Sequence, residues 1–528
     1  MKTILKLSFL FLFIHNTIAQ VNNDLLFKVL DKETNEPVAY ATVMVKEINR
    51  GTHADTDGFF EIPIEYSQNY SITISSIGYI SKEILLSSIK DRSLITIIYL
   101  NPANTVLEEI VVKSKRKKNK ENILAYTIVK KAIEKIPENY PTKPFSYVGY
   151  YRDYQQPLND DYKNFINSKN DIDYVNLHEG IIEVFDNGFG TNQLTDNNNQ
   201  TVLYSFKTNT DFKVDTTLTI PYDNTFSKFS NYFKITPLGG NELNLLNLTN
   251  AVRNYNKMSF SFANVFQKDF LENHEFRKKS LKYFDDELLY EIDFKTKKQS
   301  KRVDYFANGK IYINKKSYAI HKLTYNLYFG NTNNLQYSVT SEFQKKEDKM
   351  YLNYITFNNF FMAKSSDFFK VSKVTLDVNS FSFKIELNKE IDEKYFNSLQ
   401  RKINIIYKDK FLKISNVKIL NNKTLKVFLD TSQTTILREK DEADFGSRFE
   451  IELKNIKDIN GYKINKTVDL KFNQYRELFV QEIFTDKKIT NEKEFVNKSL
   501  PLSESKISPS SFKEAYWMNT PLKKTKKN

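Results

Sequence analysis

Short runs of alternating apolar and polar residues fill the chain between residues 25 and 100. A period of two is the pattern of β-strands that bury one face. Turn-forming residues interrupt the runs at 34–37 and 55–58, where Asn, Pro, Asp and Gly occur. The pattern predicts a small antiparallel β-sandwich over residues 21–104. Its predicted strands are 26–30, 38–45, 59–64, 70–75 and 94–100.

A helical period follows this sandwich. Apolar residues recur one turn apart from Leu124 to Ile136, which gives one continuous apolar face. Asn122 stands where a helix cap is expected, and Pro137 ends the pattern. The period therefore predicts a helix over 122–136. Further helical stretches are predicted within 175–185 and 241–276.

Residues 288–376 return to the period of two, with Tyr and Phe at alternate positions. This pattern predicts a meander of long antiparallel strands that forms a curved sheet with one apolar face. Tight turns are predicted at 308–309, 314–317 and 345–348. The predicted strands are 290–295, 310–313, 318–329, 336–344 and 350–357. Together with the helices, they predict a central α+β domain over 122–376.

A third β module is predicted over 380–472, with strands at 382–387, 403–407, 412–419, 424–429 and 449–453. From 485 to 528 the chain becomes polar and rich in Lys and Ser. Trp517, the single tryptophan, lies there in a short aromatic cluster that either packs back onto the protein or contacts a partner. The chain as a whole is predicted to be a mainly β multidomain protein.

The first 19 residues have the pattern of a signal peptide. Lys2 and Lys6 precede an apolar run that ends at Ile14, and Ala19 occupies a small-residue cleavage site. No later stretch approaches the roughly 20 apolar residues of a transmembrane helix. We therefore expect cleavage, export, and a location in the periplasm or at the outer membrane.

The amino-acid composition limits which functional sites and partners the chain can have. The absence of cysteine excludes disulfides, thiolate metal sites and a cysteine nucleophile. The formal charge of +14 over 528 residues favours anionic partners, which for an exported protein means envelope surfaces and not nucleic acid. Residues 105–121 are predicted to form a solvated basic linker, with a peripheral contact to an anionic membrane surface as the second interpretation. Its cations are Lys113, Lys115, Arg116, Lys117, Lys118 and Lys120.

The sequence offers no catalytic constellation. His178-Glu179 and His274-Glu275 each begin a zinc-protease motif, but the second histidine is missing. There is no Gly-x-Ser-x-Gly elbow and no Gly-rich phosphate loop. We therefore predict no catalytic residue, no metal and no cofactor, while carboxylates from distant segments leave a glycosidase-like site as the alternative.

Three motifs in the first 80 residues resemble one family. They are EPVAYATV at 36–43, GTHADTDGFF at 51–60 and IGY at 77–79. In this order they resemble the carboxypeptidase regulatory-like domain of Bacteroidota envelope proteins. The resemblance implies a prealbumin-like β-sandwich that serves as an accessory module without an active site. It also accounts for Asp55 and Asp57 as hairpin turn residues and not as calcium ligands.

Other segments carry further resemblances. Residues 107–112 resemble the stretch that follows this domain in TonB-dependent receptors. The rest of the chain lacks the regular strands of about 10 residues that a large barrel needs, so a linker is expected there and not a TonB contact. Residues 132–153 resemble a segment of a group of exported Bacteroidota proteins. This resemblance implies a cellular location and a domain architecture, but no activity. Residues 290–320 resemble the half-barrel of periplasmic lipoprotein carriers, whose concave side holds acyl chains. Residues 387–392 and 456–462 resemble the ends of a bacterial Ig-like domain.

These observations predict a non-enzymatic binding or scaffolding protein at the periplasmic face of the outer membrane. Its partner would be an envelope lipid, a glycan or an outer-membrane protein. The predicted working surface is the aromatic concave face of residues 288–376, on which a ligand would contact Tyr312, Tyr318, Tyr325 and Tyr337. The alternatives are an envelope hydrolase that uses carboxylates of the central domain, and an adhesin-like spacer if that domain has a filled interior.

Overall fold

The computed structural model places most of the chain between residues 24 and 522. It describes residues 24–67, 69–91, 94–103, 115–158, 162, 173–193, 195–218, 242–256, 270–297, 305–330, 335–364, 368–440, 445–490, 494–509 and 515–522. The predicted signal peptide at 1–19 lies outside these residues. Among the helices that are described, none is both long and apolar enough to cross a membrane.

The N-terminal sandwich consists of two small sheets. One has the order β4-β1-β7 and the other β3-β2-β5-β6. Stacked Phe27 and Phe60, with ring centroids 4.8 Å apart, lie in the apolar core between the sheets. The strands are β1 (Leu25–Asp31), β2 (Thr42–Val45), β3 (Arg50–His53), β4 (Phe59–Ile62), β5 (Ser71–Ser75), β6 (Lys82–Leu85) and β7 (Thr96–Leu100). The predicted small β-sandwich is therefore confirmed.

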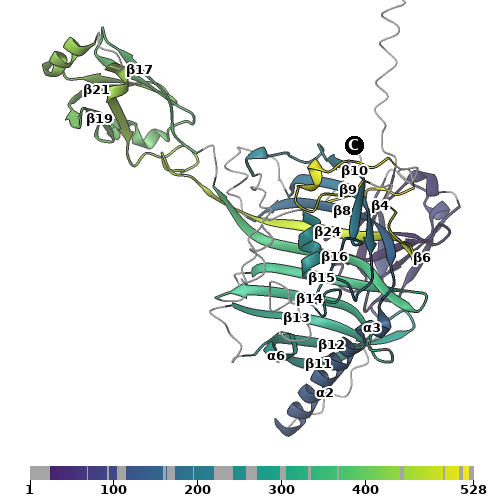
Figure 1. Ribbon diagram of the computed structural model, residues 1–528. Coiled ribbons are helices and arrows are strands. Elements are labelled where there is room, and N and C mark those ends of the chain that lie inside the picture. The colour runs from purple at the N-terminus through teal and green to yellow at the C-terminus, as the bar shows by residue number, and fades with distance from the viewer. Residues whose placement is uncertain are drawn as a thin grey trace, which may run out of the picture.

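The centre of the molecule is one antiparallel sheet of ten strands (Figure 1). Its order is β10-β9-β8-β24-β16-β15-β14-β13-β12-β11, so β24 from the far end of the chain pairs with both β8 and β16. The strands are β8 (Phe145–Pro157), β9 (Val175–Asp186), β10 (Gln200–Thr208), β11 (His274–Phe284), β12 (Glu287–Thr296), β13 (Tyr305–Asn314), β14 (Ile320–Phe329), β15 (Leu335–Lys346), β16 (Lys349–Lys364) and β24 (Asp469–Phe484). The meander predicted over 288–376 is confirmed as far as β16, whose last residue is Lys364.

Two local predictions in this region were wrong. The stretch 175–185, predicted to be helical, is strand β9, which is buried on both faces and so lacks the alternation that marks a half-buried strand. The turn predicted at Asn308-Gly309 lies inside β13 instead. Gly309 serves close packing there, because a Cβ atom would lie 1.9 Å from the Thr324 carbonyl oxygen and 2.5 Å from the Phe294 ring.

Helices cover the inner face of the sheet, which is the face toward the largest apolar cluster. They are α2 (Lys115–Glu134), α3 (Ile136–Asn139), α5 (Glu242–Thr249) and α6 (Leu271–Asn273). α2 packs on β11 and β13, and its Ala125, Val129 and Ala132 are buried in this apolar cluster. The linker predicted over 105–121 was too long, because α2 already begins at Lys115. Lys and Arg are good helix formers, which explains why the helix extends into the basic run.

A second sandwich is inserted between β16 and β24 and stands away from the large sheet (Figure 1). Its sheets have the orders β17-β18-β22-β21 and β20-β19-β23 around an apolar core. The predicted boundaries at 376 and 472 need correction, since β17 belongs to this sandwich and β24 to the large sheet. Its strands are β17 (Val371–Asp377), β18 (Ser382–Leu387), β19 (Ile403–Tyr407), β20 (Lys410–Leu412), β21 (Ile414–Asn421), β22 (Thr424–Leu429) and β23 (Phe449–Leu453).

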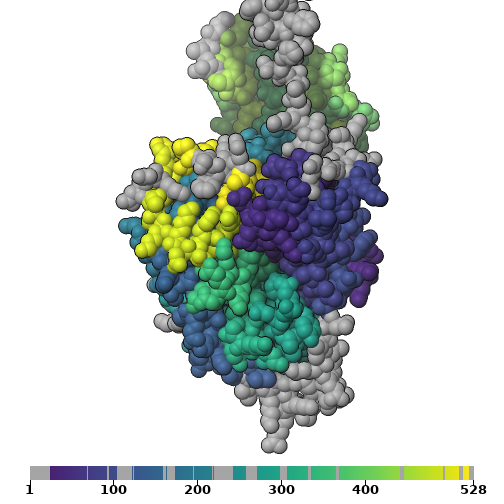
Figure 2. All heavy atoms as spheres, turned by 90° about the vertical axis from the view of Figure 1, so that its right-hand side faces the viewer, coloured from purple at the N-terminus to yellow at the C-terminus, as the bar shows by residue number. Residues whose placement is uncertain are grey.

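The N-terminal sandwich and residues 515–519 of the C-terminal segment pack on the outer face of the large sheet, whereas Val496 and Leu502 of the same segment belong to the inner-face apolar cluster. Figure 2 shows the C-terminal segment in contact with the sandwich. The backbone N–H groups of Val496 and Ser508 donate to Thr201 and Leu203 on edge strand β10. Trp517 packs on Tyr66 of the sandwich, with ring centroids 5.7 Å apart. Of the two interpretations of its aromatic cluster, packing back onto the protein is therefore the correct one.

Candidate functional site

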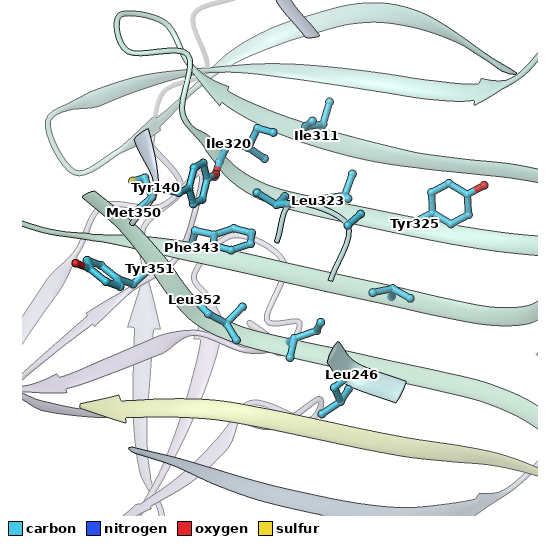
Figure 3. Packing of buried hydrophobic residues seen from close by; sticks show 14 of the residues in the cluster. Tyr140, Leu246, Ile311, Ile320, Leu323, Tyr325, Phe343, Met350, Tyr351 and Leu352 are labelled. Atoms are coloured by element: carbon cyan, nitrogen blue, oxygen red, sulfur yellow. The ribbon is translucent and has the colours of Figure 1, made fainter. Parts of the chain in front are cut away.

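The inner face of β12–β16 is filled by the side chains of the fold itself. Figure 3 shows Ile311, Leu323 and Tyr325 directed to the same side of the sheet. Tyr140, which follows α3, lies among them, and its hydroxyl donates a hydrogen bond of 2.6 Å to the Ile320 carbonyl. Its ring also packs edge-on against Phe343. The apolar face predicted from the alternation therefore exists, and in the described structure it is core.

Two of the four predicted ligand-binding tyrosines belong to this core. Tyr325 is 1% exposed, and its hydroxyl lies 3.4 Å from Nε2 of His274. Tyr337 is fully buried and stacks on Phe357 with ring centroids 5.5 Å apart. Both side chains point to the inner face, as predicted, but their surfaces are occupied by protein.

The other two tyrosines lie elsewhere, which corrects the prediction of one shared surface. Tyr312 follows inner-face Ile311 on β13 and therefore points to the outer face, where its hydroxyl donates to Oε1 of Glu291 at 3.2 Å. Burial raises the pKa of Tyr312 to about 12. Tyr318 is in the turn before β14 with a φ of 61°, and the Lys131 ammonium lies 4.0 Å from its ring centroid. Strand alternation and a turn thus separate residues that the sequence placed together.

The predicted anionic contact falls at the start of α2. Lys115, Arg116, Lys117, Lys118 and Lys120 lie in its first two turns, and their side chains are outside the described part of the structure. Lys113 lies outside the described residues altogether.

Polar side chains gather on the inner face where β8, β9, β16 and β24 meet. The Tyr151 hydroxyl donates to Oδ2 of Asp153 at 2.9 Å. Arg476 donates from Nη1 to Oδ1 of Asn359 at 3.0 Å. Glu242, at the start of α5, accepts from the backbone N–H of Leu502 at 3.1 Å. The inner face therefore changes from apolar to polar along its strands.

Two carboxyl groups in this polar region are shifted toward the protonated form. Burial and the neighbouring Asp153 raise the pKa of Glu242 to about 7. Burial also raises the pKa of Asp153, while His178 and Arg476 act in the opposite direction. A protonated carboxyl group can donate as well as accept a hydrogen bond, so this pair can recognise a polar ligand or exchange a proton. The sequence signal that could have identified Asp153 is its place within the aromatic run of β8.

A second buried polar centre lies on the outer face, between the N-terminal sandwich and the large sheet. Arg152 and Glu477 are both fully buried, with Nε and Oε2 2.5 Å apart. Oε1 of Glu477 also accepts from the hydroxyls of Tyr40 at 2.7 Å and Tyr154 at 3.2 Å. The C-terminal segment joins through the Asn519 carbonyl, which accepts from Arg152 at 3.5 Å. Three distant parts of the chain therefore meet at one ion pair.

The N-terminal sandwich contributes two titratable groups to the same interface. Nε2 of His53 lies 3.0 Å from Oδ1 of Asn353, and burial lowers the pKa of His53 to about 4. Oδ1 of Asp55 accepts from the N–H groups of Asp57 and Phe59, yet burial raises its pKa to about 8. Asp55 is thus a turn residue, as the motif implied, and burial keeps it neutral near pH 7.

The remaining candidates for chemistry are dispersed. Among the described residues, no group of three or more His, Asp or Glu side chains is placed to hold a metal ion. His178 is near Thr208, His274 is buried against Phe270, and His321 pairs with Glu287 at 3.2 Å. Three surface cavities of about 620, 580 and 490 Å³ are lined by other parts of the chain than Asp153 and Glu242.

Among the comparisons with known proteins, a family match is found for the N-terminal sandwich alone. No curated protein matches the chain. A LolA superfamily protein from Nitrosomonas europaea is 12% identical over 44% of this chain and 85% of its own, with a TM-score of 0.18. A DUF1329 family protein from Desulfovibrio piger is 10% identical over 45% of this chain and 86% of its own, with a TM-score of 0.19. Likeness at this level carries no argument about function. Residues 28–112 match the CarboxypepD_reg-like domain family, which supports the resemblance inferred for the N-terminal sandwich from its three motifs.

Proposed function

We propose that the protein is a non-enzymatic scaffolding protein of the cell envelope. The large sheet, the N-terminal sandwich and the C-terminal segment form a rigid platform, which presents the inserted sandwich to a partner. The observation that carries the proposal is the buried ion pair of Arg152 and Glu477. It joins strands β8 and β24, the N-terminal sandwich through Tyr40 and the C-terminal segment through Asn519. Arg152 and Glu477 face each other on paired strands, and separation of the sandwich or the C-terminal segment would remove the hydrogen bonds with Tyr40 and Asn519 that complete this buried centre. We infer that these shared hydrogen bonds hold the large sheet, the N-terminal sandwich and the C-terminal segment together as one body.

The inserted sandwich is attached in a way that leaves the platform intact. Lys364 at the end of β16 lies directly opposite Asp469 at the start of β24. The insertion thus begins and ends at two neighbouring positions of an unbroken sheet. On its surface Phe411 is 69% exposed and Leu420 52% exposed. Single exposed apolar side chains are common on protein surfaces, so we propose these two as the partner contact because of the domain that carries them, which projects from the large sheet.

The filled inner face favours a scaffold over a carrier. A carrier needs space beside its apolar surface, whereas Tyr325 and Tyr337 are covered by protein in the described structure. The proposed location is the periplasm or the outer membrane, because residues 1–19 have the pattern of a signal peptide. The proposed partners are an outer-membrane protein, a lipid or a glycan of the envelope.

The test is to remove the insertion and keep the platform. An Asn-Gly turn that joins Lys364 to Asp469 replaces residues 365–468 and closes a hairpin between strands that already pair. We expect this variant to unfold cooperatively and to lose the envelope proteins that cross-link to the full chain. An unchanged cross-linking pattern in a folded variant would refute the proposed role of the inserted sandwich.

A second candidate function is favoured by the polar region at Asp153 and Glu242. Their raised pKa values beside the apolar cluster would suit the polar end of an amphiphilic ligand, which would have to displace inner-face side chains because none of the three cavities described above includes these residues. Native mass spectrometry with lipid extraction, on mature protein purified from its own envelope, tests this candidate. A co-purifying lipid or glycan that is lost in the Asp153→Asn variant would support it. A clean apo mass would leave the scaffold as the better function.

A further inference from the structure

A surface hollow of about 620 Å³ lies on strands β11–β14, near the edge of the large sheet. Its volume falls within the range of about 300 to 1,000 Å³ that is usual for small-molecule sites. Arg277, Asp293 and Lys310 line it, and each alternates with an inner-face residue along its strand. The hollow therefore opens mainly on the outer face, apart from both buried polar centres.

Positive charge exceeds negative charge in this hollow. Four cations line it, and three of them are paired: Lys279 with Asp293 at 3.1 Å, Lys295 with Glu275 at 3.4 Å and Lys310 with Glu291 at 2.8 Å. Arg277 is exposed and forms no described hydrogen bond or ion pair with the residues around it. Its planar guanidinium can therefore bind a carboxylate or phosphate through two parallel hydrogen bonds.

Neutral polar groups share the surface with these charges. Asn308, Thr324 and Asn326 offer both donors and acceptors, and Asn326 donates to Oδ1 of Asn308 at 3.2 Å. Oδ1 of Asp293 is buried and has no hydrogen-bond partner among the described residues. A buried acceptor of this kind calls for a donor. An inorganic anion without a hydroxyl group, such as sulfate, would not supply one.

Helix α2 borders the same hollow. Asn122 lies on its rim, and α2 begins seven residues earlier at Lys115. The basic residues for which the sequence predicted an anionic contact therefore lie on the helix that reaches this site. The sequence predicted an anionic membrane surface as a secondary contact of these residues, and the charge of the hollow likewise favours an anion.

We propose that this hollow binds a saccharide that carries a carboxylate or phosphate group. Arg277 holds the anionic group, Oδ1 of Asp293 accepts from a ligand hydroxyl, and the amide groups of Asn308 and Asn326, whose oxygens already accept from Asn326 and Ser338, provide further polar contacts. A saccharide with an anionic group satisfies both kinds of surface, since its hydroxyls donate to the acceptors and its anion pairs with the guanidinium. The hollow includes no residue of the inserted sandwich, so this proposal can be tested independently of the proposed scaffolding function.

Titration calorimetry on the mature full-length chain tests this proposal. The probes are trigalacturonate, neutral maltotriose of the same length, and phosphatidylcholine vesicles with and without lipopolysaccharide. The diagnostic variant is Arg277→Gln, and the matched control is Arg438→Gln at an exposed position of the inserted sandwich. Thermal unfolding of both variants should match the parent, because neither side chain is buried.

We expect trigalacturonate to bind, maltotriose to bind at least tenfold more weakly, and Arg277→Gln to lose at least tenfold in affinity while Arg438→Gln loses none. Binding only to vesicles that contain lipopolysaccharide, with the same dependence on Arg277, would show that the anionic saccharide is recognised as the headgroup of a lipid. Equal binding of maltotriose, equal losses in the two variants, or no binding to either anionic probe would overturn the proposal.

Discussion

Replacement of Arg152 by methionine would leave Glu477 as a buried carboxylate without its ionic partner. Both side chains are fully buried in the parent, and Nε lies 2.5 Å from Oε2. Methionine keeps most of the length of arginine and is apolar, so the change removes charge with little loss of packing volume. The effect should therefore report on electrostatics more than on a cavity.

The expected loss follows from the contacts that remain. Breaking a buried ion pair by removing one partner typically costs about 3 to 5 kcal/mol. Glu477 would keep the Tyr40 and Tyr154 hydroxyls as donors, and hydrogen bonds to charged groups contribute roughly 1.5 to 3 kcal/mol each. We therefore expect the lower end, a loss of about 3 kcal/mol. In the double variant with Glu477→Gln, the two losses should be less than additive by about 1 kcal/mol or more.

Urea unfolding measures this loss, and the single tryptophan makes the readout local. Trp517 packs on Tyr66, so its fluorescence follows the contact between the C-terminal segment and the N-terminal sandwich. Circular dichroism follows the sheets. The two transitions should coincide in the parent, and the Trp517 transition should come first in Arg152→Met. A loss below about 1 kcal/mol, or strictly additive losses in the double variant, would refute the reasoning.

Three further outcomes are expected. Burial raises the pKa of Asp55 to about 8, so its protonated form stabilises the fold at low pH and this stabilisation is lost as the pH rises toward 8. The parent should therefore lose about 1 kcal/mol of unfolding free energy between pH 7 and 8 through Asp55, and Asp55→Asn should not show this part of the loss. An equal pH dependence of the two proteins would contradict the assignment. Gly309→Ala should cost about 2 kcal/mol or more from overpacking, whereas Gly446→Ala, with no atom within 4 Å of its Cβ position, should cost well under that. Tyr337→Ala should cost about 3 to 5 kcal/mol as a core truncation and Tyr312→Ala clearly less; equal losses in chemical denaturation would place both in the core.

Local patterns were informative wherever neighbouring residues alone decide the structure. The meander from β12 to β16 follows from alternation and from the turn at 314–317, because consecutive strands pair with one another. Strand β9 was missed because its residues are buried on both faces and show no alternation. The candidate tyrosines were separated for a related reason, since a period of two assigns a face only when the turn positions are known.

The sequence by itself determined that this protein is mainly β, that its N-terminal sandwich resembles the CarboxypepD_reg-like family, and that cysteine chemistry is excluded. These properties depend on composition, on short motifs and on the local period. Only the tertiary structure decided that β24 closes the sheet between β8 and β16, and that Arg152 meets Glu477 across 325 positions of the chain. The physical reason is that β-pairing and buried charge pairs join residues distant in sequence, and no local period records which partner each will find.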